Sequence, residues 1–157
     1  MNNFQNVIYR NNAADFQVTN EDISRINYGD FGALLATGTV LACEPSRSAT
    51  FLAFEKAKEA GLPIIFDIDY RPYSWSSPEI ASEVLTQAGK QSDLLIGNDE
   101  EFDFMAGGIK KGLNEAKHLA KNSERIVIYK MGSEGAITFA SGNEIRTGIF
   151  PAAPVKP

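Results

Sequence analysis

The sequence is short of the residues and motifs on which several common classes of protein depend. It has one cysteine, Cys43, and one histidine, His118, among 157 residues. A lone cysteine cannot form an internal disulfide, and neither residue has a second Cys or His at the spacing of a zinc site. The sequence also lacks a P-loop, G-x-x-x-x-G-K-[ST], and a dinucleotide-binding G-x-G-x-x-G. A disulfide scaffold, a zinc site and these two nucleotide motifs are therefore not supported.

Long apolar runs and an excess of positive charge are absent as well. No run approaches the ~20 apolar residues that a membrane-spanning helix needs, and the first residues lack the basic and apolar regions of a signal peptide. Fifteen Lys and Arg face twenty Asp and Glu, giving a net charge of −5 and a pI near 4.9. This balance disfavours a general nucleic-acid or anionic-membrane surface but permits one local basic pocket. We expect a cytoplasmic protein with no nucleic-acid or membrane partner.

The composition is that of an ordinary globular protein. Hydrophobic residues make up 43% and charged residues 22% of the chain. At roughly 100–200 residues per domain, the length predicts one domain. Residues 1–10 have the pattern of a strand that begins in mid-element, and residues 150–157 are an extended, proline-rich stretch. We therefore expect residues 1–157 to be a single domain that is present only in part.

Short apolar runs alternate with helical patterns along most of the chain. The runs show no polar alternation, as in parallel strands covered on both faces, and lie at residues 32–37, 62–67, 93–97 and 125–130. Helical spacing occurs at residues 46–60, 77–89, 99–105 and 113–120. Residues 136–140 and 144–150 then predict a β-hairpin about a turn at 141–143. The sequence predicts an α/β fold, a doubly wound and mostly parallel sheet with helices on both faces, incomplete at both ends.

Ligands of such sheets bind beyond the carboxyl ends of the strands, which here are residues 37–38, 67–75, 98–101 and 130–135. Residues 67–75 hold two carboxylates, one guanidinium and three aromatic rings. The planar guanidinium of Arg71 is suited to grip a carboxylate or phosphate. The structural alternative is that Asp67 and Asp69 both pair with Arg71 and hold the loop down. Both interpretations remain open.

Two further segments have a structural and a functional interpretation. Asn98 is a good N-cap for an acidic first turn, but Asn98 and Glu101 could also act through water on a magnesium ion. Lys130 precedes Gly132 and Gly135, whose spacing allows a close backbone approach to a nucleotide, although most such turns are only turns. Arg10 ends the opening strand, and its position alone indicates exposed surface.

In this order the segments resemble the ribokinase-like (PfkB) carbohydrate kinases over nearly the whole chain. The segments that carry the resemblance are residues 9–15, 37–39, 44–47, 66–75, 98–102 and 130–136. The likeness is strongest to a branch of the family that phosphorylates a sugar acid from inositol breakdown. Residues 67–75 are specific to that branch, whereas Gly132-x-x-Gly135 is common across the family.

The resemblance implies ATP-dependent phosphorylation of a sugar-acid hydroxyl, with Mg²⁺ as the metal. It assigns the substrate contacts to Arg10, Asp69 and Arg71. It assigns the nucleotide contacts to Lys130, Gly132 and Gly135, and the metal and phosphate contacts to Asn98 and Glu101.

The family's catalytic aspartate belongs to a Gly-Ala-Gly-Asp motif, which the sequence does not contain. On the family pattern this aspartate lies beyond Pro157. The resemblance therefore implies that these 157 residues alone are inactive, and that the full-length enzyme is a possible homodimer. Three alternatives stay open: a family kinase with a keto-deoxygluconate or fructose-type substrate, a non-catalytic sugar- or nucleotide-binding module, and an unstable partial gene product.

Overall fold

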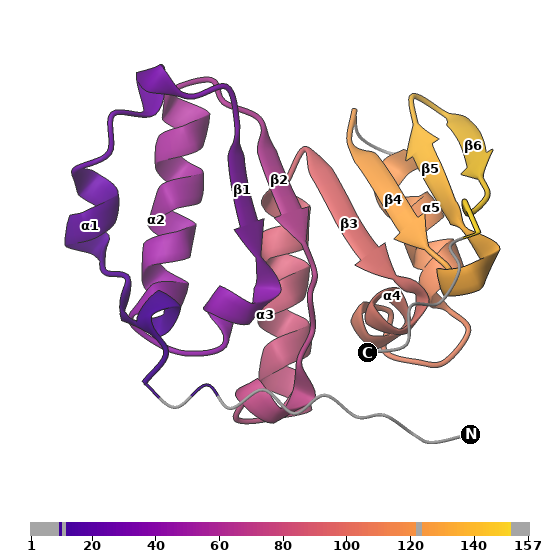
Figure 1. Ribbon diagram of the computed structural model, residues 1–157, viewed down its shortest axis with the longest axis horizontal. Helices are drawn as coiled ribbons and strands as arrows, with labels where there is room; N and C mark the ends of the chain where they lie inside the picture. The colour runs from indigo at the N-terminus through magenta and orange to yellow at the C-terminus, as the bar shows by residue number, and fades with distance from the viewer. Residues whose placement is uncertain (1–9, 11, 122–123, 152–157) are drawn as a thin grey trace.

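The computed structural model describes residues 10, 12–121 and 124–151. The strand expected over residues 1–10 lies outside the described residues, apart from Arg10. The described residues form one six-stranded sheet with helices packed against it (Figure 1).

The strands follow chain order across the sheet. They are β1 (Leu34–Thr37), β2 (Ile64–Asp67), β3 (Leu94–Asn98), β4 (Ile126–Lys130), β5 (Ala136–Ala140) and β6 (Asn143–Thr147). Strands β1 to β4 are parallel, whereas β5 and β6 join the edge of β4 as an antiparallel hairpin. The predicted α/β fold, with four parallel strands from the four apolar runs and a hairpin after them, is confirmed.

The longer helices also lie where the sequence predicts them. The α-helices are α1 (Asn20–Ser24), α2 (Ser46–Glu59), α3 (Pro78–Gln91), α4 (Asp99–Met105) and α5 (Gly112–Lys121). Helix α3 begins as expected, because the side chain of Ser77 accepts a hydrogen bond from the Ile80 N–H and Pro78 occupies the first turn. Helix α1 was not predicted, since five residues are too few to show a helical period.

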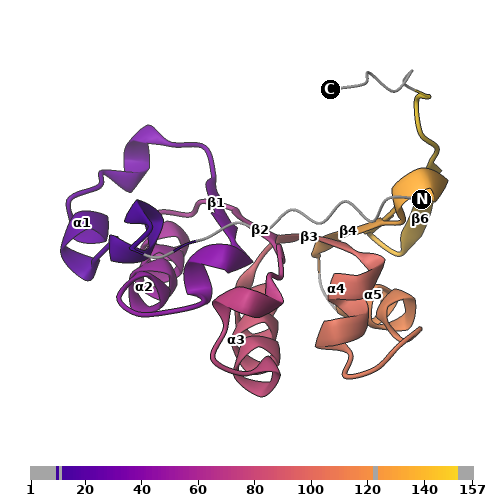
Figure 2. The ribbon, with the colours of Figure 1, turned by 60° about the horizontal axis from the view of Figure 1, so that its bottom comes forward.

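The helices α2 to α5 gather on one face of the sheet in the described part of the chain (Figure 2). Successive parallel strands are neighbours in the sheet and follow one direction across it, so each right-handed crossover places its helix on the same face of the sheet. The strand residues on this face are buried, among them Phe66, Leu95 and Val127. Strand residues on the other face are less covered, and Leu35 is 64% exposed. A second helical layer is therefore not seen among the described residues.

The main core lies between the sheet and its helices. Phe54 of α2 and Phe66 of β2 are fully buried, and their rings meet edge to face with centroids 6.3 Å apart. No helix in the described ranges is long and apolar enough to cross a membrane. The packing of the helices against the sheet holds the carboxyl ends of β1 to β4 in fixed relative positions.

Candidate functional site

The polar segments predicted to bind ligands meet at one edge of the sheet. Thr37 at the end of β1 lies beside Asp67 at the end of β2, and Asn98 at the end of β3 lies beside Lys130 at the end of β4. All four strands point the same way, so their carboxyl ends share this edge (Figure 1). The structure thus brings together segments that are almost a hundred positions apart in sequence.

Glu101 joins two of these segments and is only 5% exposed. Its Oε1 accepts a hydrogen bond from the Tyr70 N–H at 3.1 Å, and its Oε2 accepts one from the Asn98 N–H at 2.8 Å. Asn98 Oδ1 in turn accepts the Glu101 N–H at 2.8 Å, which completes a capping box at the start of α4. Burial raises the pKa of the Glu101 carboxyl, against the opposing effects of the Asn98 hydrogen bond and the Lys130 charge.

Arg71 lies close to the Glu101 carboxylate, and its side chain is 41% exposed. Its Nη2 is 2.5 Å from Asp69 Oδ1, its Nη1 donates to the Tyr70 carbonyl oxygen at 3.0 Å, and the same Nη1 is 3.9 Å from Glu101 Oε1. A guanidinium has five N–H donors, more than these partners use. The structure therefore brings Asp69, Arg71 and Glu101 together and leaves Arg71 with donors for an anion.

Asp67 is a site residue that the sequence analysis did not select. Its Oδ1 is buried without a hydrogen-bond partner among the described residues and lies 3.6 Å from Lys130 Nζ. The alternative in which both aspartates pair with Arg71 is correct for Asp69 and wrong for Asp67, whose ion-pair partner is Lys130. In the sequence, the one indication of a role for Asp67 is its position as the last residue of a predicted buried strand, where ligands of such sheets bind.

Arg10 is not the exposed surface residue that its sequence position indicates. Its side chain is 19% exposed, forms an ion pair with Asp15, and lies over the ring of Phe16 at 4.4 Å from the centroid. Phe16 belongs to a short 3-10 helix, η1 (Ala14–Gln17). These are its contacts within the described part of the chain, and they do not include Arg71. The structure does not join the two arginines in one network.

The two glycines after β4 have different surroundings. Gly132 is the first residue of the 3-10 helix η5 (Gly132–Glu134) and Gly135 directly follows it, with φ of +56° at Gly132 and +88° at Gly135. A Cβ on Gly135 would lie 2.0 Å from the Thr147 carbonyl oxygen, so the protein's own hairpin requires this glycine. A Cβ on Gly132 would meet nothing within 4 Å. Only Gly132 therefore borders open space into which a ligand could come.

The candidate metal ligands do not form a protein cage. No group of three or more His, Cys, Asp or Glu residues in the described ranges could hold a metal ion. Each Glu101 oxygen and Asn98 Oδ1 already accepts one backbone hydrogen bond, but each oxygen keeps a further lone pair. This donor set fits Mg²⁺ that keeps its waters and is bound mainly by phosphates, with Asn98 and Glu101 orienting the waters.

Comparison with known sequences identifies one matching family and several relatives that share one name. Residues 2–157 match the model of the pfkB family carbohydrate kinases. The chain is 38% identical over 154 residues to a 5-dehydro-2-deoxygluconokinase of Geobacillus thermodenitrificans, covering 96% of this chain and 46% of that protein. It is 33% identical over 144 residues to one of Halalkalibacterium halodurans, covering 90% and 44%. The chain thus spans less than half the length of these relatives.

Solved structures share the fold. A PfkB protein from Polaromonas sp. JS666 matches with a TM-score of 0.78 and 24% identity, covering 90% of this chain and 48% of that one. A fructokinase from Vibrio cholerae O395, with fructose, ADP and calcium ion bound, matches with a TM-score of 0.67 and 25% identity, covering 82% and 44%. The arrangement of parallel strands and helices described above is therefore the ribokinase-like arrangement.

Proposed function

The chain belongs to the pfkB family of carbohydrate kinases, and from this premise we propose that it is part of an ATP-dependent sugar-acid kinase. The proposed reaction converts 5-dehydro-2-deoxy-D-gluconate to its 6-phosphate, in the cytoplasm and in the catabolism of myo-inositol. Relatives named for this activity, at 33–38% identity, support the substrate. In this proposal residues 1–157 are one part of a single kinase domain.

The position of Arg71 is the observation that carries the proposal. Its half-exposed guanidinium lies at the carboxyl edge of the sheet, between Asp69 and Glu101. There it can give two parallel hydrogen bonds to the carboxylate of a sugar acid. The Tyr70 carbonyl and Glu101 hold the guanidinium in place before the substrate arrives, which lowers the entropic cost of binding. Asp69, beside it, can accept a hydrogen bond from a sugar hydroxyl. The role of Arg10 as a second cation for the carboxylate rests on the family resemblance, since its contacts in the described part of the chain are with Asp15 and Phe16.

The neighbouring strand ends are assigned to the nucleotide. Phosphoryl transfer depends mainly on positioning and on stabilising the charge of the phosphates. In the proposal Lys130 directs its ammonium group at the phosphates and Gly132 leaves room for the nucleotide beside β4, while Gly135 shapes the turn that follows by packing against the hairpin. Mg²⁺, when bound with the nucleotide, would neutralise phosphate charge. Asn98 and Glu101 would hold its waters through the oxygens described above.

Replacing Arg71 with lysine tests the assigned grip. Lysine keeps the charge but cannot offer two parallel donors, so we expect the Kd of the 157-residue chain for the sugar acid to rise by about tenfold or more. Isothermal titration calorimetry measures the change. Arg25→Lys, an exposed arginine paired with Glu21, is the matched control and should leave the Kd unchanged. An unaltered Kd in Arg71→Lys would refute the role given to Arg71.

The same calorimetry separates the alternatives. The fructokinase likeness favours fructose as a second candidate substrate, and 2-keto-3-deoxygluconate is the third member of the panel. A kinase of another branch should bind one of these two more tightly than 5-dehydro-2-deoxygluconate. A protein that binds neither a sugar acid nor Mg·ADP would not be a kinase module.

We expect no kinase turnover from the 157-residue polypeptide by itself. Its sequence holds no Gly-Ala-Gly-Asp motif, and in the proposal that motif supplies the base that orients the sugar hydroxyl. A coupled assay of ADP release, with a blank that omits the sugar acid, measures this. Sugar-dependent turnover well above the blank would show that residues within the chain supply the base.

A further inference from the structure

Helix α4 holds the loop that carries Arg71 at two points, both on Tyr70. Glu101 of α4 accepts the Tyr70 N–H at 3.1 Å. Phe104 of α4 stacks on the Tyr70 ring, with centroids 4.0 Å apart and an angle of 13° between the rings. Glu101 and Phe104 are three positions apart, so they lie on the same face of the helix. The backbone and the side chain of Tyr70 are therefore both fixed by α4.

The backbone of this loop depends on such support. The chain leaves the sheet after Ile68, whose N–H still donates to the carbonyl oxygen of Ile96 in β3 at 2.9 Å. The next residue, Asp69, has φ of +35°. This left-handed conformation is uncommon for a residue with a Cβ and persists only where the surrounding structure holds it. The contacts between Tyr70 and α4 follow directly and supply that hold.

The position of Tyr70 is passed on to Arg71. Arg71 Nη1 donates to the Tyr70 carbonyl oxygen at 3.0 Å, and Arg71 Nη2 is paired with Asp69. If Tyr70 moves, both groups that orient the guanidinium therefore move with it. Two parallel hydrogen bonds to a carboxylate require N–H donors that point in fixed directions. A change that frees Tyr70 would thus weaken this grip without removing any atom that contacts the ligand.

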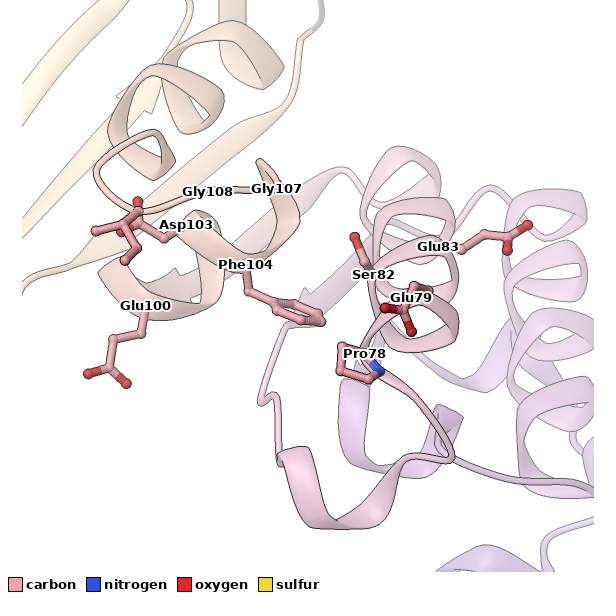
Figure 3. Close-up of a pocket in the computed structure, with 10 residues that line it drawn as sticks. Pro78, Glu79, Ser82, Glu83, Glu100, Asp103, Phe104, Gly107 and Gly108 are labelled. Atoms are coloured by element: carbon pink, nitrogen blue, oxygen red, sulfur yellow. The ribbon is translucent and has the colours of Figure 1, made fainter.

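Phe104 itself lies on another side of the loop. It projects from α4 toward Pro78 at the beginning of α3 (Figure 3). Its partly buried side chain lines a cleft of about 830 Å³ between these two helices. The residues of the described chain that line this cleft do not include Arg71 or Glu101. Phe104 therefore reaches the candidate site through the Tyr70 ring.

We propose that Phe104 is a positioning residue for sugar-acid binding, acting through the Tyr70 ring on the guanidinium of Arg71; this inference rests on the function proposed above. The stacked ring keeps the loop in the conformation that binds. Without the ring the loop holds that conformation for only part of the time, which raises the apparent Kd in inverse proportion to that fraction. Nucleotide affinity is unaffected, because Lys130 and Gly132 belong to the segment at the end of β4.

Calorimetry of Phe104→Leu in the 157-residue chain tests the role of the ring. Leucine stays apolar but cannot stack, so the Kd for the sugar acid should rise about fivefold while the Kd for Mg·ADP is unchanged. Phe104→Tyr keeps the ring, has room at the cleft and should restore the wild-type Kd. Phe51→Leu is the matched control: Phe51 on α2 is also partly buried and meets another ring, that of Phe54, at 6.0 Å. It should change neither Kd.

A double variant shows whether Phe104 acts through Arg71. Arg71→Lys has already lost the two parallel hydrogen bonds, so adding Phe104→Leu should raise the sugar-acid Kd by less than about twofold more. A further fivefold rise in the double variant would show that Phe104 acts independently of the guanidinium, and would overturn the proposal.

Amide hydrogen exchange measures the positioning with no ligand present. In Phe104→Leu the Tyr70 N–H should exchange about fivefold faster, whereas the Ile68 N–H, held by β3, should keep its rate. Equal acceleration of both amides would mean a general loss of stability and would overturn the specific role. Wild-type sugar-acid affinity in Phe104→Leu, beside weakened binding in Arg71→Lys, would overturn this inference alone. A wild-type chain that does not bind the sugar acid would overturn the proposed function as well.

Discussion

Replacing Glu101 with alanine should lower the free energy of unfolding by about 3 kcal/mol, because two partly buried backbone N–H groups lose the carboxyl acceptor that binds them both. Those groups belong to Tyr70 and Asn98, in different segments of the chain. Urea denaturation measures the loss. Glu100→Ala is the matched control in the same helical turn, since the Glu100 side chain is exposed, and it should change stability by no more than about 0.5 kcal/mol. Equal losses in the two variants would contradict the role of Glu101.

The effect of Glu101 should also depend on pH. Its pKa is raised by burial, so between its ordinary value and the raised value the folded protein keeps a proton that the unfolded chain has released. The contribution of Glu101 to stability is therefore largest below this window and falls as pH rises through it. In metal-free buffer the stability deficit of Glu101→Gln relative to wild type should shrink as pH rises. A deficit that grows would mean that the pKa is lowered.

Replacing Gly38 with alanine should cost about 3 kcal/mol of stability by overpacking. Gly38 follows β1, and a Cβ there would lie 2.0 Å from the Ile68 carbonyl oxygen and 2.6 Å from a Leu85 methyl carbon. Backbone cannot move aside as a flexible side chain can. Gly32, on the other side of β1, is the matched control, because a Cβ there would meet nothing within 4 Å. Gly32→Ala should be neutral or stabilising by up to about 1 kcal/mol.

The same substitution should weaken ligand binding in the molecules that still fold. Ile68 directly precedes Asp69, so pushing its carbonyl away moves the loop that holds Arg71. Calorimetry below the unfolding transition should show weaker sugar-acid binding in Gly38→Ala and unaltered binding in Gly32→Ala. Full affinity in Gly38→Ala would show that the loop is positioned independently of β1.

Local sequence patterns were sufficient to predict the strands and the longer helices, although not the five-residue helix α1. The four apolar runs became β1 to β4, and the Ser77-Pro78 pair marks the start of α3. The capping interpretation of Asn98 and Glu101 is confirmed by hydrogen bonds between residues three positions apart. These features depend on side-chain period and on neighbours within one helical turn, and so they can be read from the sequence.

The single cysteine, the lack of long apolar runs and the lack of a P-loop or dinucleotide-binding motif narrowed the class of protein, and local patterns determined its strands and longer helices. Tertiary structure alone decided which charges meet. Lys130 pairs with Asp67, 63 positions away, across the intervening strand β3, and Glu101 binds the Tyr70 N–H, 31 positions away. It also decided that Phe104 of α4 stacks on Tyr70, which follows β2. Such contacts depend on strand order and crossover direction, which no local pattern encodes.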